Sequence, residues 1–294
     1  MSVETYGAQE CRVYFVQESV YGQIPTNPTM LGINTEGPDP KINPSLIEVM
    51  GVGSKDLQAL YVGMRKVNLK IPYLPGQIAP TSLIQHVQTL SSLSVLVAYY
   101  KGLWTSPSNI IAFLHTGCKI DKLTVESKVD DIVKADVELI GQNVARSTSL
   151  PSGATFGDYP GGIPFYLAKV QKGAAGGGSL TDLTDVTDWK FEIQNNLKEV
   201  PIIQSLPSGA TATLLKYLRE RNRKLSGELT LEFESDWALA DVLNDTQFSL
   251  NFQLGSGHAA LFTYCKWEEF NPTTKIKDLV SVKLKFLAQN VAIT

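Results

Sequence analysis

The sequence predicts a mainly β protein built from two tandem units of the same kind. Apolar and polar residues alternate along several stretches, as in strands that have one face on a core and one in water. A block of sequence recurs 147 residues further on, and each half contains one short helical pattern. The 294 residues are 43% hydrophobic and 19% charged, which is enough to bury a substantial core. We expect two units, residues 1–147 and 148–294.

The repeat is most evident at the end of each unit. Residues 116–145 align without a gap on residues 263–292, with ten of the 30 positions identical, and both copies end in Gln-Asn-Val-Ala. A second block, residues 84–99, aligns in apolar pattern on residues 239–254. Upstream, residues 67–73 align on 227–233 and residues 46–49 on 197–200. This internal similarity indicates one ancestral unit that was duplicated and fused.

Each unit is predicted to be an antiparallel β-sandwich or barrel with one short helix on its flank. Alternation sends one set of side chains into the core: Leu229, Leu231, Phe233, Val133, Val137 and Leu139. The predicted helices span residues 81–92 and 236–246, where apolar residues recur three apart, and Thr81 and Asp236 are candidate caps.

Residues 146–189 are rich in Gly, Pro, Ser and Thr, which predicts mostly loop. Residues 164–171 and 189–194 are expected to be the arms of a hairpin with a glycine-rich tip at 172–185. Residues 11–17 share Val-Gln with residues 170–171, so an N-terminal arm is expected to precede the first unit as well.

Composition excludes several classes of function. A net charge of −3 and a pI near 5.7 give no global cationic field, so tight binding of nucleic acid is not expected. No apolar run approaches the length of a membrane span, and no secretory signal is visible, which predicts assembly in the cytoplasm. Cys11, Cys118 and Cys265 are too scattered for a disulfide framework or zinc site and are expected to be buried apolar side chains.

No motif indicates an enzyme, a metal site or a cofactor. The run "GAAGGGS" at 173–179 lacks the Gly-Lys-Ser/Thr ending of a phosphate loop, and "TDLTDVTD" at 181–188 lacks the ligand spacing of a calcium loop. The three histidines have no metal-ligand spacing. The basic run "YLRERNRK" at 217–224 is expected to be a solvated face or a partner for acidic neighbours.

The layout resembles the tail tube proteins of tailed viruses. The resemblance is carried by the duplicated β unit with one helix, the "ESVYGQIPTNPTM" segment at 18–30, the "NNLKEV" segment at 195–200 and the strand run that ends each unit. It implies a virion structural protein whose inner strands join those of neighbouring subunits into a barrel, stacked as rings into a hollow tube for DNA. A chain with two fused units is then expected to form a homotrimer with pseudo-hexameric symmetry.

The resemblance also implies partners and a location. We expect self-association into rings and tubes, contact with tape measure, terminator and baseplate or tip proteins, and transient non-specific contact with viral double-stranded DNA. The location is the virion tail, after assembly in the host cytoplasm.

The trimer is the smallest ring that fits a DNA conduit. About four strands from each of six units give about 24 strands, and a spacing of about 4.8 Å with a tilt of about 45° gives a backbone radius of about 26 Å. Side chains then leave a bore of roughly 40 Å, enough for a duplex about 20 Å wide, whereas half the strands would exclude it.

Two sets of residues are assigned to the tube. The polar positions expected to line the lumen are Lys134, Asp136, Glu138, Glu228, Thr230, Glu232, Glu234, Ser281, Lys283 and Lys285. The N-terminal arm and the glycine-rich hairpin are expected to contact neighbouring subunits or the next ring through Val16, Tyr21, Gly173, Gly177, Asp182 and Asp185.

Two other classes remain as alternatives. A DNA-encircling clamp is expected to line its bore with basic helices, whereas residues 81–92 contain no Lys or Arg. A carbohydrate-binding or adhesive β-sandwich is expected to expose clustered aromatic residues, whereas Trp104, Trp189, Trp237 and Trp267 are dispersed in the sequence.

Overall fold

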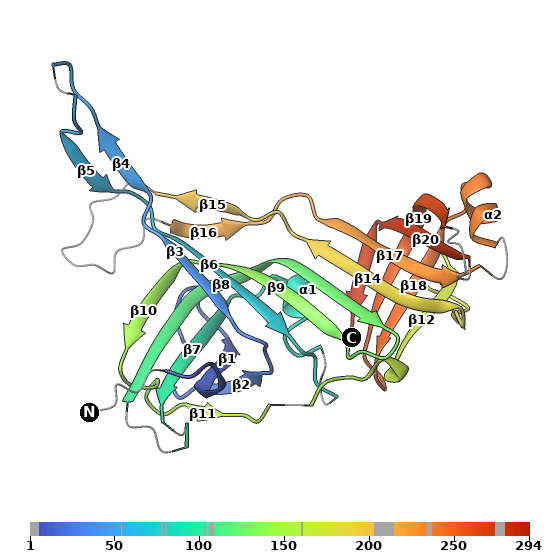
Figure 1. Ribbon diagram of the computed structural model, residues 1–294, viewed down its shortest axis with the longest axis horizontal. Helices are drawn as coiled ribbons and strands as arrows, with labels where there is room; N and C mark the ends of the chain where they lie inside the picture. Colours follow the sequence, from blue (N-terminus) through green and yellow to red (C-terminus); the bar gives the residue numbers. More distant parts are fainter. Residues whose placement is uncertain are drawn as a thin grey trace.

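The chain is mainly β, as predicted (Figure 1). The computed structural model describes residues 6–53, 55–77, 79, 81–102, 104–105, 109–159, 161–202, 215–233, 237–273 and 280–294. Within this part of the chain there are two α-helices, α1 (His86–Thr89) and α2 (Trp237–Leu243), and two 3₁₀ turns, η1 (Ala8–Glu10) and η2 (Phe165–Leu167). None of the described helices is long and apolar enough to cross a membrane.

One inner sheet runs through both halves of the molecule. Its eight strands pair in the order β3-β6-β9-β8-β14-β17-β20-β19, all antiparallel. Figure 1 shows this sheet as a layer that extends from β3 and β6 in the first half to β17, β20 and β19 in the second. The strands are β3 (Asp39–Asn43), β6 (Lys66–Tyr73), β9 (Lys134–Gly141), β8 (Asn109–Lys128), β14 (Val186–Gln194), β17 (Lys224–Glu232), β20 (Ser281–Ala288) and β19 (Ala259–Thr273).

Each half adds an outer sheet of its own. The first has the order β2-β1-β7-β8-β10, and the second has the order β13-β12-β18-β19-β21. The added strands are β1 (Cys11–Gln17), β2 (Thr29–Ile33), β7 (Leu93–Lys101), β10 (Asn143–Ser147), β12 (Ala168–Ala174), β13 (Thr181–Asp182), β18 (Phe248–Leu254) and β21 (Asn290–Ile293).

The long strands β8 and β19 belong to both the inner and an outer sheet. Each crosses between them at a residue with left-handed backbone, Gly117 (φ 64°) in β8 and Tyr264 (φ 54°) in β19. The return crossing lies at Gln142 between β9 and β10 and at Gln289 between β20 and β21. The repeated Gln-Asn-Val-Ala therefore marks the point where the chain leaves the inner sheet and enters the outer one.

The two halves have the same strand registers. Lys122 of β8 pairs with Glu138 of β9, and Glu269 of β19 pairs with Lys285 of β20, each residue 147 positions after its counterpart. Leu93 pairs with Cys118 as Phe248 pairs with Cys265, which agrees with the shift of 155 in the second block. β6 pairs with β9 as β17 pairs with β20. These pairings make residues 67–73 equivalent to residues 225–231, which start two residues earlier than the segment on which the sequence alignment placed them.

Buried side chains of both halves form one continuous core between the inner and outer sheets. It contains the predicted core residues Leu229, Leu231, Val133, Val137 and Leu139. Phe233 is an exception: it lies one residue beyond the end of β17 and is 45% exposed, so its assignment to the core was wrong.

Two local predictions are corrected. Residues 164–171 and 189–194 do not form a hairpin, because β12 lies in the second outer sheet and β14 in the inner sheet. The glycine-rich segment instead turns β12 back onto the short strand β13. The first helix is only the turn α1, with no cap bond from a side chain, whereas α2 agrees with the predicted second helix; its expected cap, Asp236, lies outside the described residues.

Two paired hairpins extend from corresponding places in the inner sheet. The first joins β3 to β6 and consists of β4 (Leu46–Val49) and β5 (Ala59–Val62); the second joins β14 to β17 and consists of β15 (Lys198–Pro201) and β16 (Leu215–Arg219). In Figure 1 the hairpin β15–β16 extends over the first half, and the hairpin β4–β5 projects beyond the first half. After residue 147 the short strand β11 (Thr155–Phe156) pairs with β2 of the first half.

Candidate lumen and assembly surfaces

The inner sheet has an apolar face on the core and a polar face on which basic and acidic side chains alternate across the strands. One row of directly paired positions crosses six strands with signs that alternate throughout. Its members are Lys134, Glu126, Lys190, Glu228, Lys285 and Glu269. Cross-strand neighbours of opposite charge stabilise a sheet, and like charges would destabilise it.

A second row runs in the same way over the first half. Asp39, Lys70, Glu138 and Lys122 are successive partners across β3, β6, β9 and β8. The two rows give the polar face a mixed surface with little local excess of either sign.

Ion pairs join many of these side chains. The Lys122 Nζ atom lies 2.9 Å from Glu192, that of Lys283 lies 2.9 Å from Glu228, and Lys285 pairs with Glu269. Hydrogen bonding to Glu192 raises the pKa of Lys122, and hydrogen bonding to Glu269 raises that of Lys285. Lys122 and Lys285 therefore stay charged, and their charge is compensated within the sheet.

The residues predicted to line the lumen lie together on this polar face, except one. Lys134, Asp136 and Glu138 are on β9, Glu228, Thr230 and Glu232 on β17, and Ser281, Lys283 and Lys285 on β20. Glu234 lies outside the described residues. That this face encloses a channel stays a prediction.

The two halves are joined edge to edge through β8 and β14. Seven residue pairs form this junction, including Lys122 with Gln194, Thr124 with Glu192 and Glu126 with Lys190. On the core side Ile193 of β14 lies opposite Leu123 of β8, and both are fully buried.

A buried amide strengthens the junction. The Asn195 side chain donates to the carbonyl oxygens of Val87 (3.0 Å) and Ile120 (2.9 Å) and accepts a hydrogen bond from the Nε atom of Arg223 (2.8 Å). Arg223 also donates to the Gln88 carbonyl at 3.1 Å. The sequence prediction of a solvated face was therefore wrong for Arg223, which connects the second half to α1; the run of basic residues gave no signal of this role.

The hairpin β15–β16 lies against the first half. The Gln142 side chain donates to the carbonyl oxygen of Leu215 at 3.0 Å, and Lys66 pairs with Glu199 at 3.4 Å. Leu215 and Leu218 are each only 3% exposed.

The residues predicted to make inter-subunit contacts have partners within the chain. Val16 is on β1, which pairs with β2 and β7 on its two sides. Tyr21 has a buried hydroxyl beside the backbone of Leu218, and burial raises its pKa. Gly173 pairs with Ser249 of β18, and the carbonyl of Asp185 accepts a hydrogen bond from the Glu232 amide.

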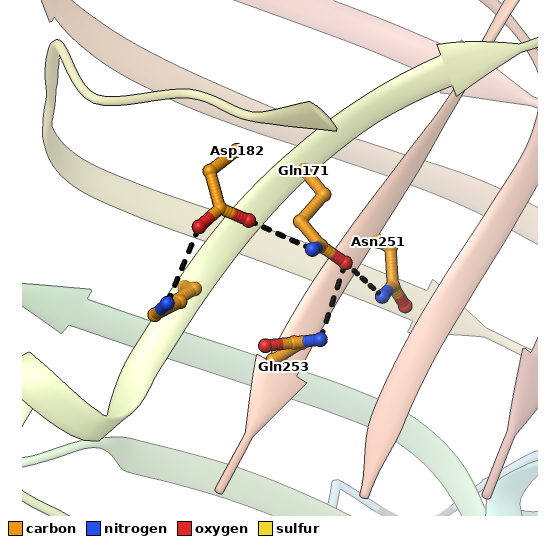
Figure 2. A network of polar contacts seen from close by, with 5 residues as sticks. Gln171, Asp182, Asn251 and Gln253 are labelled. Atoms are coloured by element: carbon orange, nitrogen blue, oxygen red, sulfur yellow. Dashed lines mark hydrogen bonds and ion pairs between the residues drawn. The ribbon is translucent and has the colours of Figure 1, made fainter. Parts of the chain in front are cut away.

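The glycine-rich turn is held by a polar network (Figure 2). Asp182 accepts hydrogen bonds from Gln171 (2.7 Å) and Lys169 (3.2 Å), and the Gln171 side-chain oxygen accepts from Asn251 (2.8 Å) and Gln253 (3.2 Å). The hydrogen bonds from Gln171 and Lys169 lower the pKa of Asp182. Gly177 completes the turn with left-handed backbone (φ 91°). Contacts of these residues with other subunits stay predictions.

The two ends of the inner sheet are edges. Among the described residues, β3 pairs only with β6, and residues 266–273 of β19 pair only with β20. Ile42 of β3 pairs with β6 at the position where Ile193 of β14 pairs with β17, so the two isoleucines are equivalent. Ile42 is 45% exposed, whereas Ile193 is fully buried.

The family to which the chain belongs follows from comparison with known proteins. A family model described as "Phage tail tube protein" matches residues 78–289. A comparison with curated protein sequences found no match.

Solved structures also align with part of the chain. A chain from the tail of an empty gene transfer agent (GTA) particle, refined with C6 symmetry, aligns over 44% of this chain and 96% of its own, with 10% identity and a TM-score of 0.36. A chain from the virion of a native gene transfer agent particle aligns over 42% of this chain and 95% of its own, with 8% identity and a TM-score of 0.33.

The family match covers β8 and β14, which form the junction between the halves, and most of the polar face. It also decides the class of function, because tail tube proteins are structural components of the virion tail and not enzymes. The chain belongs to the phage tail tube protein family.

Proposed function

We propose that this chain is the major tail tube subunit, that its two halves are duplicated tube units, and that three copies close into a ring with pseudo-sixfold symmetry. The observation that carries the proposal is that the two strands of the internal β8–β14 junction have counterparts at the two edges of the inner sheet. Edge strand β3 corresponds to β14, and edge strand β19 corresponds to β8. A second copy can therefore add β3 to β19 as the chain itself adds β14 to β8.

The internal junction also predicts the register between copies. Lys122 pairs with Gln194 at the internal junction, so its counterpart Glu269 is expected opposite Asn43 of the next copy. In the same way Thr124 pairs with Glu192, so Asn271 is expected opposite Lys41. Glu126 opposite Lys190 becomes Thr273 opposite Asp39. None of these positions brings like charges together, so the register is electrostatically acceptable.

Apolar residues at or near the two edges of the inner sheet support the same contact. In the proposed register Ile42 lies opposite Phe270, as Ile193 lies opposite Leu123. Val242 of α2 corresponds to Val87 of α1 at the shift of 155; Val87 is fully buried at the junction between the halves, whereas Val242 is 39% exposed. Residues that are buried at the internal junction thus have exposed counterparts where a neighbour is expected.

The contact joins two different edges, so it is head-to-tail and generates a ring if the rotation closes. Three copies with eight inner strands each give about 24 strands, and hence a bore of roughly 40 Å. In this ring the polar face lines the channel. Its compensated charges leave few cations free for phosphate, which favours passage of DNA over its retention.

Stacked rings then form the conduit for DNA delivery in the virion tail, assembled in the host cytoplasm. Tape measure, terminator and baseplate or tip proteins are the expected partners at its ends. A clamp is disfavoured because the polar face is a sheet, and α1 contains no Lys or Arg.

The test combines native mass spectrometry with negative-stain imaging of the purified protein. We expect a trimer mass and hollow tubes whose rings show sixfold modulation. A stable monomer that forms no tubes at any concentration would overturn the proposal, isolated rings that never stack would favour the clamp, and rings of another copy number would exclude the trimer.

A further inference from the structure

The hairpin β4–β5 presents apolar side chains to solvent from both of its strands and from the described residues between them. Its exposed apolar residues are Leu46, Ile47, Val49, Met50, Val52, Leu57, Leu60, Tyr61 and Val62. A solvent-exposed hydrophobic surface of this extent usually marks a contact with another molecule.

The hairpin β15–β16 shows what such a contact looks like in this protein. Glu48 pairs with Leu60 in the first hairpin, and Glu199 pairs with Leu218 in the second, so the two hairpins have matching registers. Leu218 and Leu215 lie 158 residues after Leu60 and Leu57, which is also the shift between β6 and β17.

The matching leucines differ in burial. Leu215 and Leu218 are 3% exposed, whereas Leu57 is 42% exposed and Leu60 is 56% exposed. The second hairpin buries its leucines while it lies against the first half of the same chain, whereas Leu57 and Leu60 of the first hairpin remain exposed in the part of the chain that the structure describes.

The polar contacts of the second hairpin also have counterparts. Glu199 pairs with Lys66 at the start of β6; the corresponding residues are Glu48 and Lys224, the latter at the start of β17. Gln142 donates to the Leu215 carbonyl, and its counterpart in the repeat is Gln289. Lys224 is exposed on the second half, where the hairpin of a neighbour is expected.

We propose that the hairpin β4–β5 docks on the second half of the neighbouring copy in the ring, in the way that β15–β16 docks on the first half within the chain. Leu57 and Leu60 are then buried against that copy, Glu48 forms an ion pair with its Lys224, and its Gln289 side chain donates to the Leu57 carbonyl. The occupant of this surface is a second copy of the same chain. The inference rests on the proposed ring and adds a specific interlocking contact to the strand junction.

Cross-linking tests this contact with an internal control. In a Cys11→Ser background, Glu48→Cys with Lys224→Cys is treated with a short bis-maleimide, and Lys66→Cys with Glu199→Cys is treated in parallel. The remaining cysteines, Cys118 and Cys265, are buried. We expect the first pair to give a covalent ladder that ends at the trimer, and the control pair to link within one chain and run as a monomer.

Native mass spectrometry of the same samples separates this inference from the proposed function. Trimeric rings in which the first pair gives only monomers would overturn the docking contact and leave the ring intact. A ladder that continues beyond the trimer would overturn it in favour of contact between rings. Absence of both rings and ladder would overturn both proposals.

Substitutions provide a second measurement. Leu57→Ser with Leu60→Ser should leave the melting temperature of the unassembled chain unchanged, because both side chains are exposed there, and raise the concentration for half-assembly roughly tenfold or more. Leu215→Ser with Leu218→Ser, the matched variant, should lower the melting temperature itself.

Glu48→Lys and Lys224→Glu should each weaken assembly, and the combination should restore it; failure of this rescue would contradict the ion pair.

Discussion

Gly117 and Tyr264 lie at the same point of the two halves, 147 residues apart, and both have left-handed backbone, with φ of 64° and 54°. Each lies where a long strand crosses from the outer to the inner sheet. Glycine adopts this conformation without strain, whereas a side chain makes it unfavourable by about 1–2 kcal/mol. The fold therefore retains the crossing even where the sequence does not favour it.

Substitutions at the two crossing points should differ in effect. Gly117→Ala should lower the free energy of unfolding by at least about 2 kcal/mol, because left-handed strain adds to a contact of 2.6 Å between the new Cβ and that of Gln142. Tyr264→Gly should change it by less than about 1 kcal/mol, since relief of strain is offset by the flexibility of glycine in the unfolded chain. Denaturant unfolding of the unassembled chain measures both, and equal effects would contradict the argument.

Asn195→Ala should loosen the junction between the halves. The substitution leaves two buried carbonyl groups and the Arg223 side chain without the partner they have now, which should destabilise the chain by about 3 kcal/mol. The exposed neighbour Asn222 serves as a control, because Asn222→Ala should stay within about 0.5 kcal/mol. Hydrogen exchange that accelerates in β8 and β14 together would locate the effect at the junction, and unchanged exchange there would contradict it.

Acid should destabilise the folded chain through His115. Burial lowers the pKa of this histidine from 6.5 to about 4, so the unfolded chain takes up a proton that the folded chain does not. The stabilisation is complete above about pH 6.5 and is lost as the pH falls towards 4, at about 1.4 kcal/mol per pH unit. His115→Phe, which copies Phe262 at the corresponding position, should reduce this slope, and a smaller acid sensitivity should remain from His86, whose pKa is also lowered by burial. Unfolding measured between pH 4 and 7 gives the slope, and an unchanged slope would rule out His115 as its source.

Removal of acidic residues from the polar face should make assembled tubes retain DNA. Glu126→Gln with Glu228→Gln removes carboxylates that pair with Lys190 and Lys283, so the lysines become available to phosphate. We expect measurable binding of a short duplex at low salt, with an affinity that falls steeply as salt rises. Fluorescence anisotropy over a salt series measures this binding. Asp182→Asn removes a partner of Lys169 on the outer sheet and should have little effect; equal binding by both variants would argue against the polar face as the lumen.

Strand character could be predicted from the sequence wherever one face of a strand is buried. Along β9 and β17, Val137, Leu139, Leu229 and Leu231 are buried, and the polar residues between them lie on the other face, because successive side chains of a strand point in opposite directions. The repeat was also visible, and the matching registers of Lys122–Glu138 and Glu269–Lys285 agree with its shift.

Pairing partners could not be predicted in the same way. The sequence predicts extended arms at residues 164–171 and 189–194, yet β12 pairs with β18 and β14 pairs with β8, each far away in the chain. Proximity in the sequence favours a hairpin, but these two strands bury their apolar side chains on opposite sides of the same core and therefore lie in different sheets. The roles of Asn195 and Arg223 were invisible for the same reason, since their partners are carbonyl groups brought together by the fold.

The sequence by itself thus determined the β class, the alternation that separates core from polar face, and the recurrence of residues 116–145 at 263–292, because these depend on local periodicity and on similarity between segments. The tertiary structure decided that β8 and β14 fuse the two halves into one sheet, that Lys134, Glu126, Lys190 and Glu228 line up in a row of alternating charge, and that Leu57 and Leu60 are exposed while Leu215 and Leu218 are buried. These features depend on contacts between residues distant in the chain, and only the folded arrangement of the strands brings such residues together.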